Sequence, residues 1–310
     1  MLDALPEEGR TDRPAFLLKL SRSGALTEED ERVLLGLTGN IRHYRARQSI
    51  FIEGDVPRHL LLVKSGWAYR QKYLENGKRQ IISVLLPGDF TGPFGALPPA
   101  LSHSIRAATS LAACLIDVDQ LRLAAEESPT LGGALWADLL MDSTSAYERT
   151  VTLGSLDALA RVGHLFCELH SRLSDIGLVD AGEFEMPMTQ ADMADLLGLS
   201  AVHVNRCMQQ LRATGMLSVS GGRAKVHDFQ ALASASMFEA AAYYLQPRLQ
   251  MASAASAGSR SSGAIALQLI WIKAARQPSP MPRPVPTSQR GPHCAILAGS
   301  SHWRRERYSR

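Results

Sequence analysis

The stretch at residues 189–217, TQADMADLLGLSAVHVNRCMQQLRATGML, constrains the fold more than any other part of the chain. Thr189 can cap a helix, with Asp192 three residues on as the acidic member of a capping box. Gly198 can take the left-handed conformation that ends a helix, and Ser200 can cap a second one. The stretch therefore predicts two short helices joined by a tight turn.

The apolar residues of both predicted helices recur at helical spacing. They are Met193, Leu196 and Leu197 in the first helix and Val204, Cys207, Met208 and Leu211 in the second. Two helices with this spacing and a glycine in the turn are typical of a helix-turn-helix, whose second helix enters the major groove of DNA. An ordinary helical hairpin inside another kind of domain is the alternative.

A short β-hairpin is predicted directly after the second helix. Residues 216–219 and 223–227 have the pattern of strands, and Gly221-Gly222 between them has the composition of a hairpin turn. A hairpin in this place is the wing of a winged helix-turn-helix. We therefore expect a DNA-binding domain at this end of the folded chain.

Charge is distributed unevenly along the 310 residues, a length that permits two domains with cores of their own. The net charge is +3, but residues 253–310 contain nine Lys or Arg and a single acid, Glu306. DNA binding by the rest of the chain must therefore depend on where its basic residues lie. The same tail holds six prolines and is predicted to be disordered, either as a basic extension that strengthens DNA binding or as an incidental one.

The cysteine pattern indicates a reduced, cytoplasmic protein. Cys114, Cys167, Cys207 and Cys294 lie far apart, and no secretory signal precedes them. Cys114 and Cys207 fall at apolar positions, so we expect small buried side chains there and not redox switches. No apolar run reaches the ~18 residues of a membrane span. Since no nucleophile–base pair, metal set or phosphate loop is present, the sequence does not predict an enzyme.

The first half of the chain changes from a helical to a strand pattern. Residues 1–45 are a polar start followed by one helix, which Thr27 and Asp30 would cap. From Gln48 onward, short apolar runs recur about every ten residues with hairpin turns such as Asn76-Gly77, which favours an antiparallel barrel or jelly roll. The predicted strands are residues 49–52, 59–64, 67–74, 79–86, 104–108 and 112–118.

A long helix follows, from Pro129 to about Gly154. It carries two apolar stripes, one of Leu131, Leu135, Leu139, Ala146 and Leu153 and one of Trp136, Leu140, Tyr147 and Val151. We expect the first stripe to pack on the barrel and the second on the same helix of another subunit. A monomer with a single buried helix is the alternative. Ser155 and Asp157 can cap the next helix, which places the hinge between the domains at Gly154-Ser155.

The motif GDFTGPFG at residues 88–95, an R-A-x-T strand at residues 106–109 and the long helix precede the winged helix-turn-helix. This order resembles the Crp–Fnr superfamily of bacterial transcription regulators, over about residues 20–245. The resemblance implies an α+β fold made of a jelly-roll effector domain like a cyclic-nucleotide-binding domain, a dimerisation helix and the winged helix-turn-helix. Their expected ranges are 20–128, 129–154 and 155–245, followed by the disordered tail.

The resemblance also implies a function. We expect a homodimeric, sequence-specific DNA-binding regulator that responds to an unidentified signal through its jelly roll. A constitutive regulator with a purely structural barrel is the alternative. Double-stranded DNA carrying an inverted repeat is the expected partner, and the resemblance admits RNA polymerase as another.

The effector site departs from the pattern of the family members that bind cyclic nucleotides. A glutamate after the second glycine and an arginine about ten residues on hold the nucleotide there, and these positions are Pro93 and His103 here. We therefore do not expect cyclic AMP to bind. No cysteine precedes Cys114, which argues against an iron–sulfur cluster, and no cofactor or metal is predicted. The candidate pocket residues are Gly88, Gly92, Pro93, His103 and Ser104, in what is otherwise a structural turn.

The DNA contacts are expected on the open face of the second helix and around it. The candidates for base contacts are Val202, Asn205, Arg206 and Gln209. The candidates for phosphate contacts are Thr189, Ser200, Arg212, Arg223 and Lys225.

Overall fold

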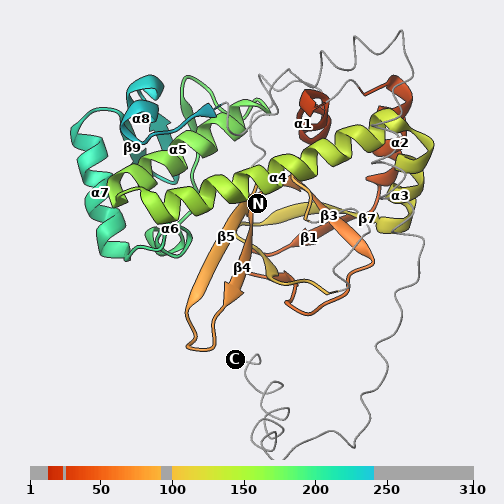
Figure 1. Ribbon diagram of the computed structural model, residues 1–310, viewed down its shortest axis with the longest axis horizontal. Coiled ribbons are helices and arrows are strands. Elements are labelled where there is room, and N and C mark those ends of the chain that lie inside the picture. Colours follow the sequence, from red (N-terminus) through yellow and green to blue (C-terminus); the bar gives the residue numbers. More distant parts are fainter. Residues whose placement is uncertain (1–12, 24–25, 92–99, 241–310) are drawn as a thin grey trace, which may run out of the picture. The chain divides into compact units, whose positions relative to one another are not determined.

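The computed structural model describes residues 13–23, 26–91 and 100–240 (Figure 1). The helices within these ranges are α1 (Ala15–Ser23), α2 (Glu28–Leu37), α3 (Val118–Glu127), α4 (Pro129–Ser155), α5 (Ala158–Ser174), α6 (Gln190–Leu197), α7 (Ala201–Ala213) and α8 (Phe229–Ala235). The strands are β1 (Ile41–Tyr44), β2 (Ser49–Phe51), β3 (His59–Ser65), β4 (Ala68–Tyr73), β5 (Arg79–Leu85), β6 (Ser104–Ala107), β7 (Leu111–Asp117), β8 (Glu183–Glu185), β9 (Leu217–Ser220) and β10 (Arg223–Val226). Gly92, Pro93 and the predicted disordered tail lie outside the described residues.

The first seven strands form the predicted jelly roll. They make two antiparallel sheets, ordered β1-β7-β3 and β2-β6-β4-β5. Alternate side chains of both sheets meet between them in an apolar core. Its buried members are Leu61, Val63, Ala68, Leu85, Ile105, Ala107, Leu111 and Ala113.

The prediction for residues 1–45 was incomplete, because the structure adds helix α1 and strand β1 to the capped helix α2. Helix α1 packs on α4 and buries Phe16, Leu17 and Leu20, an apolar set at helical spacing that the polar surroundings obscured. Strand β1 lies at a sheet edge and is largely exposed. An edge strand of this kind carries no alternation of apolar and polar residues, so its sequence gave no strand signal.

Helix α4 begins as predicted, with Pro129 in its first turn, and the Ser128 side chain accepts the Leu131 N–H. The helix ends at Ser155, within one residue of its predicted end, and the hinge at Gly154-Ser155 stays a prediction. The helix continues through Gly154, since a glycine costs a helix only about 1 kcal/mol and does not by itself end it. The chain becomes extended at Leu156, and Asp157 then caps α5. Ser155 is the last residue of α4 and not a cap.

The winged helix-turn-helix is confirmed in its local detail. Thr189 and Asp192 form the capping box of α6, Gly198 is left-handed at φ 65°, and Ser200 caps α7. The wing strands β9 and β10 pair as expected around Gly221-Gly222. A third strand, β8, adds to the other edge of β10. The core of this domain buries Val204, Cys207 and Leu211 of α7 against α5, α6 and the wing sheet.

Candidate functional site

Helix α7 presents a largely polar outer face, because Val204, Cys207 and Leu211 point into the domain. Val202 is 72% exposed, and Arg206 and Gln209 are also exposed. Gln209 Nε2 donates to Asn205 Oδ1 one turn earlier, at 2.9 Å, so these two amides lie together on this face. The four predicted base-contact residues are therefore brought together on one accessible face. Such a face fits the width of the DNA major groove.

Several of the five predicted phosphate-contact residues already have protein partners. Arg212 Nη2 donates to the Val219 carbonyl at 2.7 Å, which fastens α7 to the wing. Arg223 forms an ion pair with Glu183 across the wing sheet. Thr189 and Ser200 accept N–H groups of the helices that they cap. Lys225 lies in β10, half-buried.

Sequence reasoning missed a contact between the barrel and the first helix of the helix-turn-helix. Arg79 of β5 reaches α6, where its Nη2 lies 2.6 Å from Asp192 Oδ1 and its Nε lies 2.6 Å from Asp195 Oδ2. Gln80 Nε2 donates to the Asp195 carbonyl at 2.6 Å. Asp192 is the same carboxylate that closes the α6 capping box. We call this set of contacts the Arg79 clamp.

The Gly-Asp-Phe motif supplies a second contact between the domains. The Asp89 carboxylate is buried and accepts the Leu86 N–H at 2.8 Å. Its two oxygens also bind Lys19 Nζ of α1, at 2.9 Å, and Arg172 Nη2 of α5, at 2.6 Å. Burial alone would raise the pKa of Asp89, but the charges of Lys19 and Arg172 outweigh it and lower the pKa to about 2. Asp89 is therefore ionised at neutral pH.

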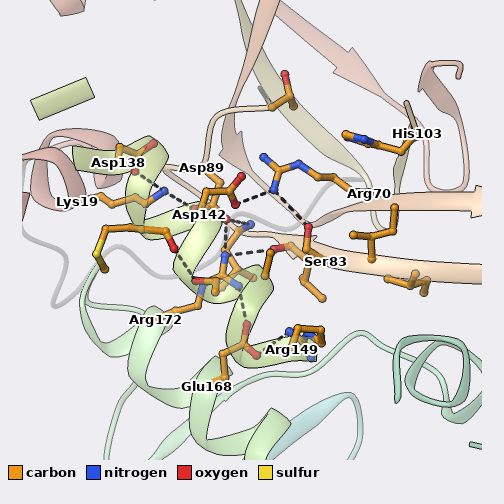
Figure 2. A pocket seen from close by; sticks show the side chains of 18 of the residues that line it. Lys19, Arg70, Ser83, Asp89, His103, Asp138, Asp142, Arg149, Glu168 and Arg172 are labelled. Carbon is orange, nitrogen blue, oxygen red and sulfur yellow. Dashed lines mark hydrogen bonds and ion pairs between the residues drawn. The ribbon is translucent and has the colours of Figure 1, made fainter. Parts of the chain in front are cut away.

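Asp89 belongs to a larger ion-pair network that joins α1, the barrel, α4 and α5 (Figure 2). Lys19 also binds Asp138 of α4 at 2.8 Å. Arg172 binds Glu168, at 3.1 Å, and Glu168 in turn binds Arg149 of α4, at 2.6 Å. The ion-pair network comprises Lys19, Asp89, Asp138, Arg149, Glu168 and Arg172. Burial alone would raise the pKa of Glu168, but Arg149 and Arg172 lower it.

A cavity of about 580 Å³ lies between the barrel, α4 and α5, bordered by the ion-pair network. Of the three predicted pocket residues that the structure describes, Gly88, His103 and Ser104, only His103 lines it. Gly88 instead has φ 90° and passes so close to Ala15 that an added Cβ would lie 3.0 Å from its carbonyl carbon. The Ser104 hydroxyl faces the loop after β2, where it accepts the Glu53 N–H at 3.0 Å. Gly88 and Ser104 are thus structural here.

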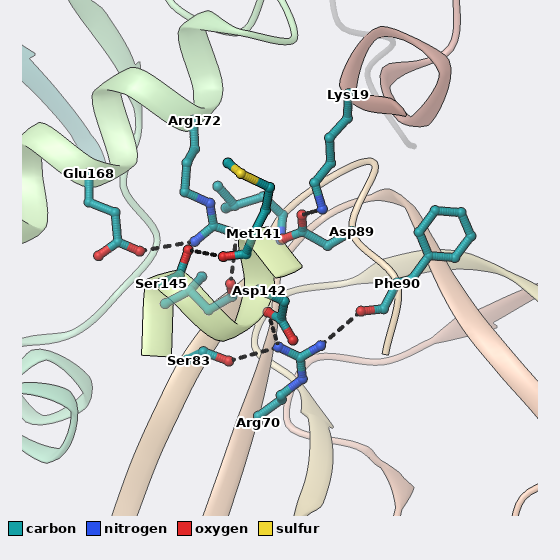
Figure 3. Close-up of polar contacts among 12 residues, drawn as sticks. Lys19, Arg70, Ser83, Asp89, Phe90, Met141, Asp142, Ser145, Glu168 and Arg172 are labelled. Atoms are coloured by element: carbon teal, nitrogen blue, oxygen red, sulfur yellow. Dashed lines mark hydrogen bonds and ion pairs between the residues drawn. The ribbon is translucent and has the colours of Figure 1, made fainter. Parts of the chain in front are cut away.

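The barrel wall of the cavity holds a charged side chain that sequence reasoning also missed. Arg70 of β4 is buried, and its guanidinium donates to the Phe90 carbonyl at 2.9 Å, to Ser83 Oγ at 3.3 Å and to Asp142 Oδ1 of α4 at 2.8 Å (Figure 3). His103 lines the same cavity. Burial, and after it the charge of Arg70, lowers the pKa of His103, so the ring is neutral at pH 7.

The two predicted stripes of α4 differ in exposure, but only in part as expected. In the first stripe Leu131 and Leu135 are buried against the barrel side, whereas Leu139 and Leu153 are half-buried and Ala146 is exposed. The members of the second stripe are exposed, Trp136 by 48%, Leu140 by 38%, Tyr147 by 70% and Val151 by 55%. A run of large exposed apolar side chains along one helix is typical of an interface.

No cluster of three or more His, Cys, Asp or Glu side chains suited to a metal ion occurs among residues 13–23, 26–91 and 100–240. Within the same ranges, no helix combines the length and the apolar character that crossing a membrane requires. Cys114, Cys167 and Cys207 are buried, and burial raises the pKa of each thiol.

The jelly roll, the long helix and the winged helix-turn-helix together define a DNA-binding regulator with an effector-type barrel. Residues 41–128 match the family described as the cyclic nucleotide-binding domain. Residues 160–235 match the Crp-like helix-turn-helix domain. The chain belongs to the Crp–Fnr superfamily of DNA-binding transcription regulators.

Named relatives agree with this assignment. The chain is 27% identical to the transcriptional activator protein FnrL of Cereibacter sphaeroides over 202 residues, which is 64% of this chain and 81% of the relative. It is 30% identical to the nitrogen fixation regulation protein FixK of Azorhizobium caulinodans over 179 residues, or 57% of this chain and 71% of the relative. The solved structure of FixK2 from Bradyrhizobium japonicum has 28% identity and a TM-score of 0.58, and the match covers 63% of this chain and 96% of that one. These relatives are regulators and not enzymes by name.

Proposed function

We propose that the protein acts as a dimer that binds an inverted DNA repeat and adjusts that binding to a signal received in the cavity at Arg70 and His103. The observation that carries this proposal is the open face of α7, on which a guanidinium and two amides lie free of the domain core. Two copies of this face on a two-fold axis would read half-sites whose centres are about one helical turn apart.

The exposed stripe of α4 supports the dimer. Packing Leu140, Tyr147 and Val151 against the same residues of a second copy would be an isologous contact. Each large apolar side chain buried in this way contributes about 1.5–3 kcal/mol. A homodimer is also consistent with membership of this family.

The Arg79 clamp and the ion pair between Arg70 and Asp142 support signal transmission. Strands β4 and β5 are paired neighbours, and they carry Arg70 at the cavity and Arg79 at α6. A ligand that prefers one arrangement of this hairpin would shift the population of DNA-binding states. A barrel that is only structural would leave DNA affinity unchanged whatever occupies the cavity.

We also propose that cyclic AMP is not the signal, since Pro93 and His103 replace the glutamate and arginine that hold it in other members. Cyclic AMP near millimolar concentration should leave the melting temperature unchanged, because a ligand stabilises only the state that it binds. A clear rise would overturn this part of the proposal. Acting on genomic DNA, the protein would work in the cytoplasm and contact RNA polymerase there.

The test is selection of DNA from a random pool with the purified full-length protein. Recovery of an inverted repeat with the expected half-site spacing would support the proposal, and recovery of a single half-site or of no consensus would contradict it. Transcription in vitro from a promoter carrying the selected site then shows whether RNA polymerase responds to the bound protein.

A further inference from the structure

Arg70 is a buried cation, and within the described part of the chain its one ion pair is with a half-exposed carboxylate, Asp142. Its side chain is 9% exposed, whereas the carboxylate of Asp142 that neutralises it is 48% exposed. The other two acceptors on its guanidinium, Ser83 Oγ and the Phe90 carbonyl, are neutral. A buried guanidinium needs a counter-charge. Asp142 supplies it from the rim of the cavity, where a competing anion could replace it.

His103 offers a second donor in the same cavity. Its Nε2 atom is buried and has no hydrogen-bond partner among the described residues. Its Nδ1 atom lies 3.3 Å from Ser102 Oγ. With the Ser102 hydroxyl donating to Nδ1, the neutral ring carries its proton on Nε2 and can donate there. A buried donor without an acceptor lowers stability, so this atom favours a ligand with an accepting oxygen.

Besides Arg70, His103 and the ion-pair network, apolar side chains line part of the cavity. Val84 of β5, Leu101 before β6, and Met141 and Leu153 of α4 all line it. A volume of about 580 Å³ falls in the range of small-molecule sites, which combine apolar walls with a few placed polar groups. This apolar part of the wall suits the body of a ligand whose charged end lies at Arg70.

We propose that the cavity binds a small organic carboxylate with an apolar body, whose carboxylate takes the place of Asp142 on Arg70 and accepts the Nε2–H of His103. This inference rests on the proposed function, since it names the class of the signal. Displacing Asp142 breaks a contact between β4 and the helix that carries the exposed stripe. The ligand would thereby change the contacts of α4 and of the β4–β5 hairpin, which carries both Arg70 and Arg79.

The test uses the full chain with two acids, octanoate and phenylacetate, and their uncharged amides, octanamide and phenylacetamide. Binding is measured by calorimetry and by the melting temperature at constant ionic strength. Both acids should bind and raise the melting temperature at concentrations on the order of millimolar, and neither amide should. Equal binding of acid and amide would overturn the proposal. So would the absence of binding of either acid to either protein, wild type or the Asp142→Asn variant.

Three variants locate the site. Asp142→Asn removes the competing carboxylate and should tighten acid binding by about tenfold, whereas Arg70→Gln should abolish it and His103→Phe should weaken it by about tenfold. The matched control is Glu126→Gln, which breaks an Arg–carboxylate pair on α3 outside the cavity and should leave acid binding unchanged. Asp142 is half-exposed, so its variant keeps the test valid should Arg70→Gln fail to fold. If Asp142→Asn bound the acids no more tightly than wild type, the proposed competition between the ligand and Asp142 for Arg70 would be overturned.

DNA binding is measured in parallel on the selected site. A protein that binds the acids but selects no DNA would contradict the proposed function and leave the pocket assignment standing. A protein that selects an inverted repeat but binds neither acid would contradict the pocket assignment and leave the proposed function standing. The two proposals can therefore be distinguished by these measurements.

Discussion

Asp89 of the turn after β5 and Arg172 of α5 form an ion pair of 2.6 Å that ties the barrel to the DNA-binding domain. The carboxylate is buried, and Lys19 of α1 shares it. The Asp of the Gly-Asp-Phe motif thus fastens together three parts of the fold. This role differs from ligand binding and explains why a carboxylate stands at that turn.

Replacing Arg172 by methionine should destabilise the protein by about 3 kcal/mol, because it leaves the buried Asp89 and Glu168 carboxylates without this cation. Lys72→Met is the matched control, since it breaks an exposed pair with Glu53 that should contribute at most about 1 kcal/mol. Urea unfolding measures both, and a double-mutant cycle with Asp89→Asn isolates the pair. Equal losses in the two single variants would contradict the structural role of the network.

The Arg79 clamp should restrain α6. Asp195→Ala is the cleaner partner variant, because Asp192 also closes the capping box. Arg79→Ala and Asp195→Ala should each speed hydrogen exchange in residues 190–197, with a coupling of about 1 kcal/mol between them. Arg32→Ala, which removes a highly exposed pair with Glu29, should leave exchange there unchanged. Additive effects of the Arg79 and Asp195 variants would show that the coupling free energy between the two residues is zero, which contradicts the prediction.

Asp30 should make stability fall in acid. Burial alone would raise its pKa, but hydrogen bonds from Ser128, Thr130 and Thr27 lower it to about 2, below the ordinary 3.8. The ionised form is therefore favoured by folding, so its contribution is present above about pH 4 and is lost as the pH falls toward 2. Between pH 5 and pH 2, wild type should lose about 1–2 kcal/mol more than Asp30→Asn.

Urea unfolding at a series of pH values checks the Asp30 prediction. The control is Asp119→Asn, whose carboxylate is 83% exposed and should leave the acid dependence as in wild type. Asp89, whose pKa is also lowered to about 2, remains in both variants and adds the same loss to each curve. Parallel curves for wild type and Asp30→Asn would contradict the prediction.

The exposed stripe of α4 should hold the dimer. Replacing both Leu140 and Tyr147 by glutamate should raise the dimer dissociation constant by about a hundredfold or more, since each loses about 1.5–3 kcal/mol of apolar burial. Leu123→Glu on α3 is the control, because Leu123 is 50% exposed and lies outside the stripe. Analytical ultracentrifugation distinguishes the states. A double variant that stays dimeric would place the interface elsewhere.

The recognition face makes the most specific prediction. Arg206→Ala should cost about 1–3 kcal/mol on the selected site and flatten preference at one base pair, as loss of a bidentate guanine contact does. Lys225→Ala should weaken all sequences alike and reduce the salt slope by about one, as loss of a phosphate contact does. Fluorescence anisotropy across several salt concentrations separates the two. If Arg206→Ala weakened every sequence equally, the assignment of this face to the major groove would be wrong.

The sequence by itself determined the elements whose signals are local. Both capping boxes, at Thr27 and at Thr189, join residues three apart, and the left-handed Gly198 ends a helix within its own turn. Such contacts form wherever the helix forms, so spacing reveals them. The same holds for the apolar faces of α7 and of α4, because periodicity depends only on the helix.

Tertiary structure decided the cavity and the contacts between the domains. Asp89 and Arg172 lie 83 positions apart, and Arg79 and Asp192 lie 113 apart. No local sequence pattern links such pairs. They come into contact only because the barrel closes and α5 and α6 pack against it. For the same reason, nothing in the sequence distinguishes Arg70 from other strand residues. Only the fold brings its guanidinium to the Asp142 carboxylate.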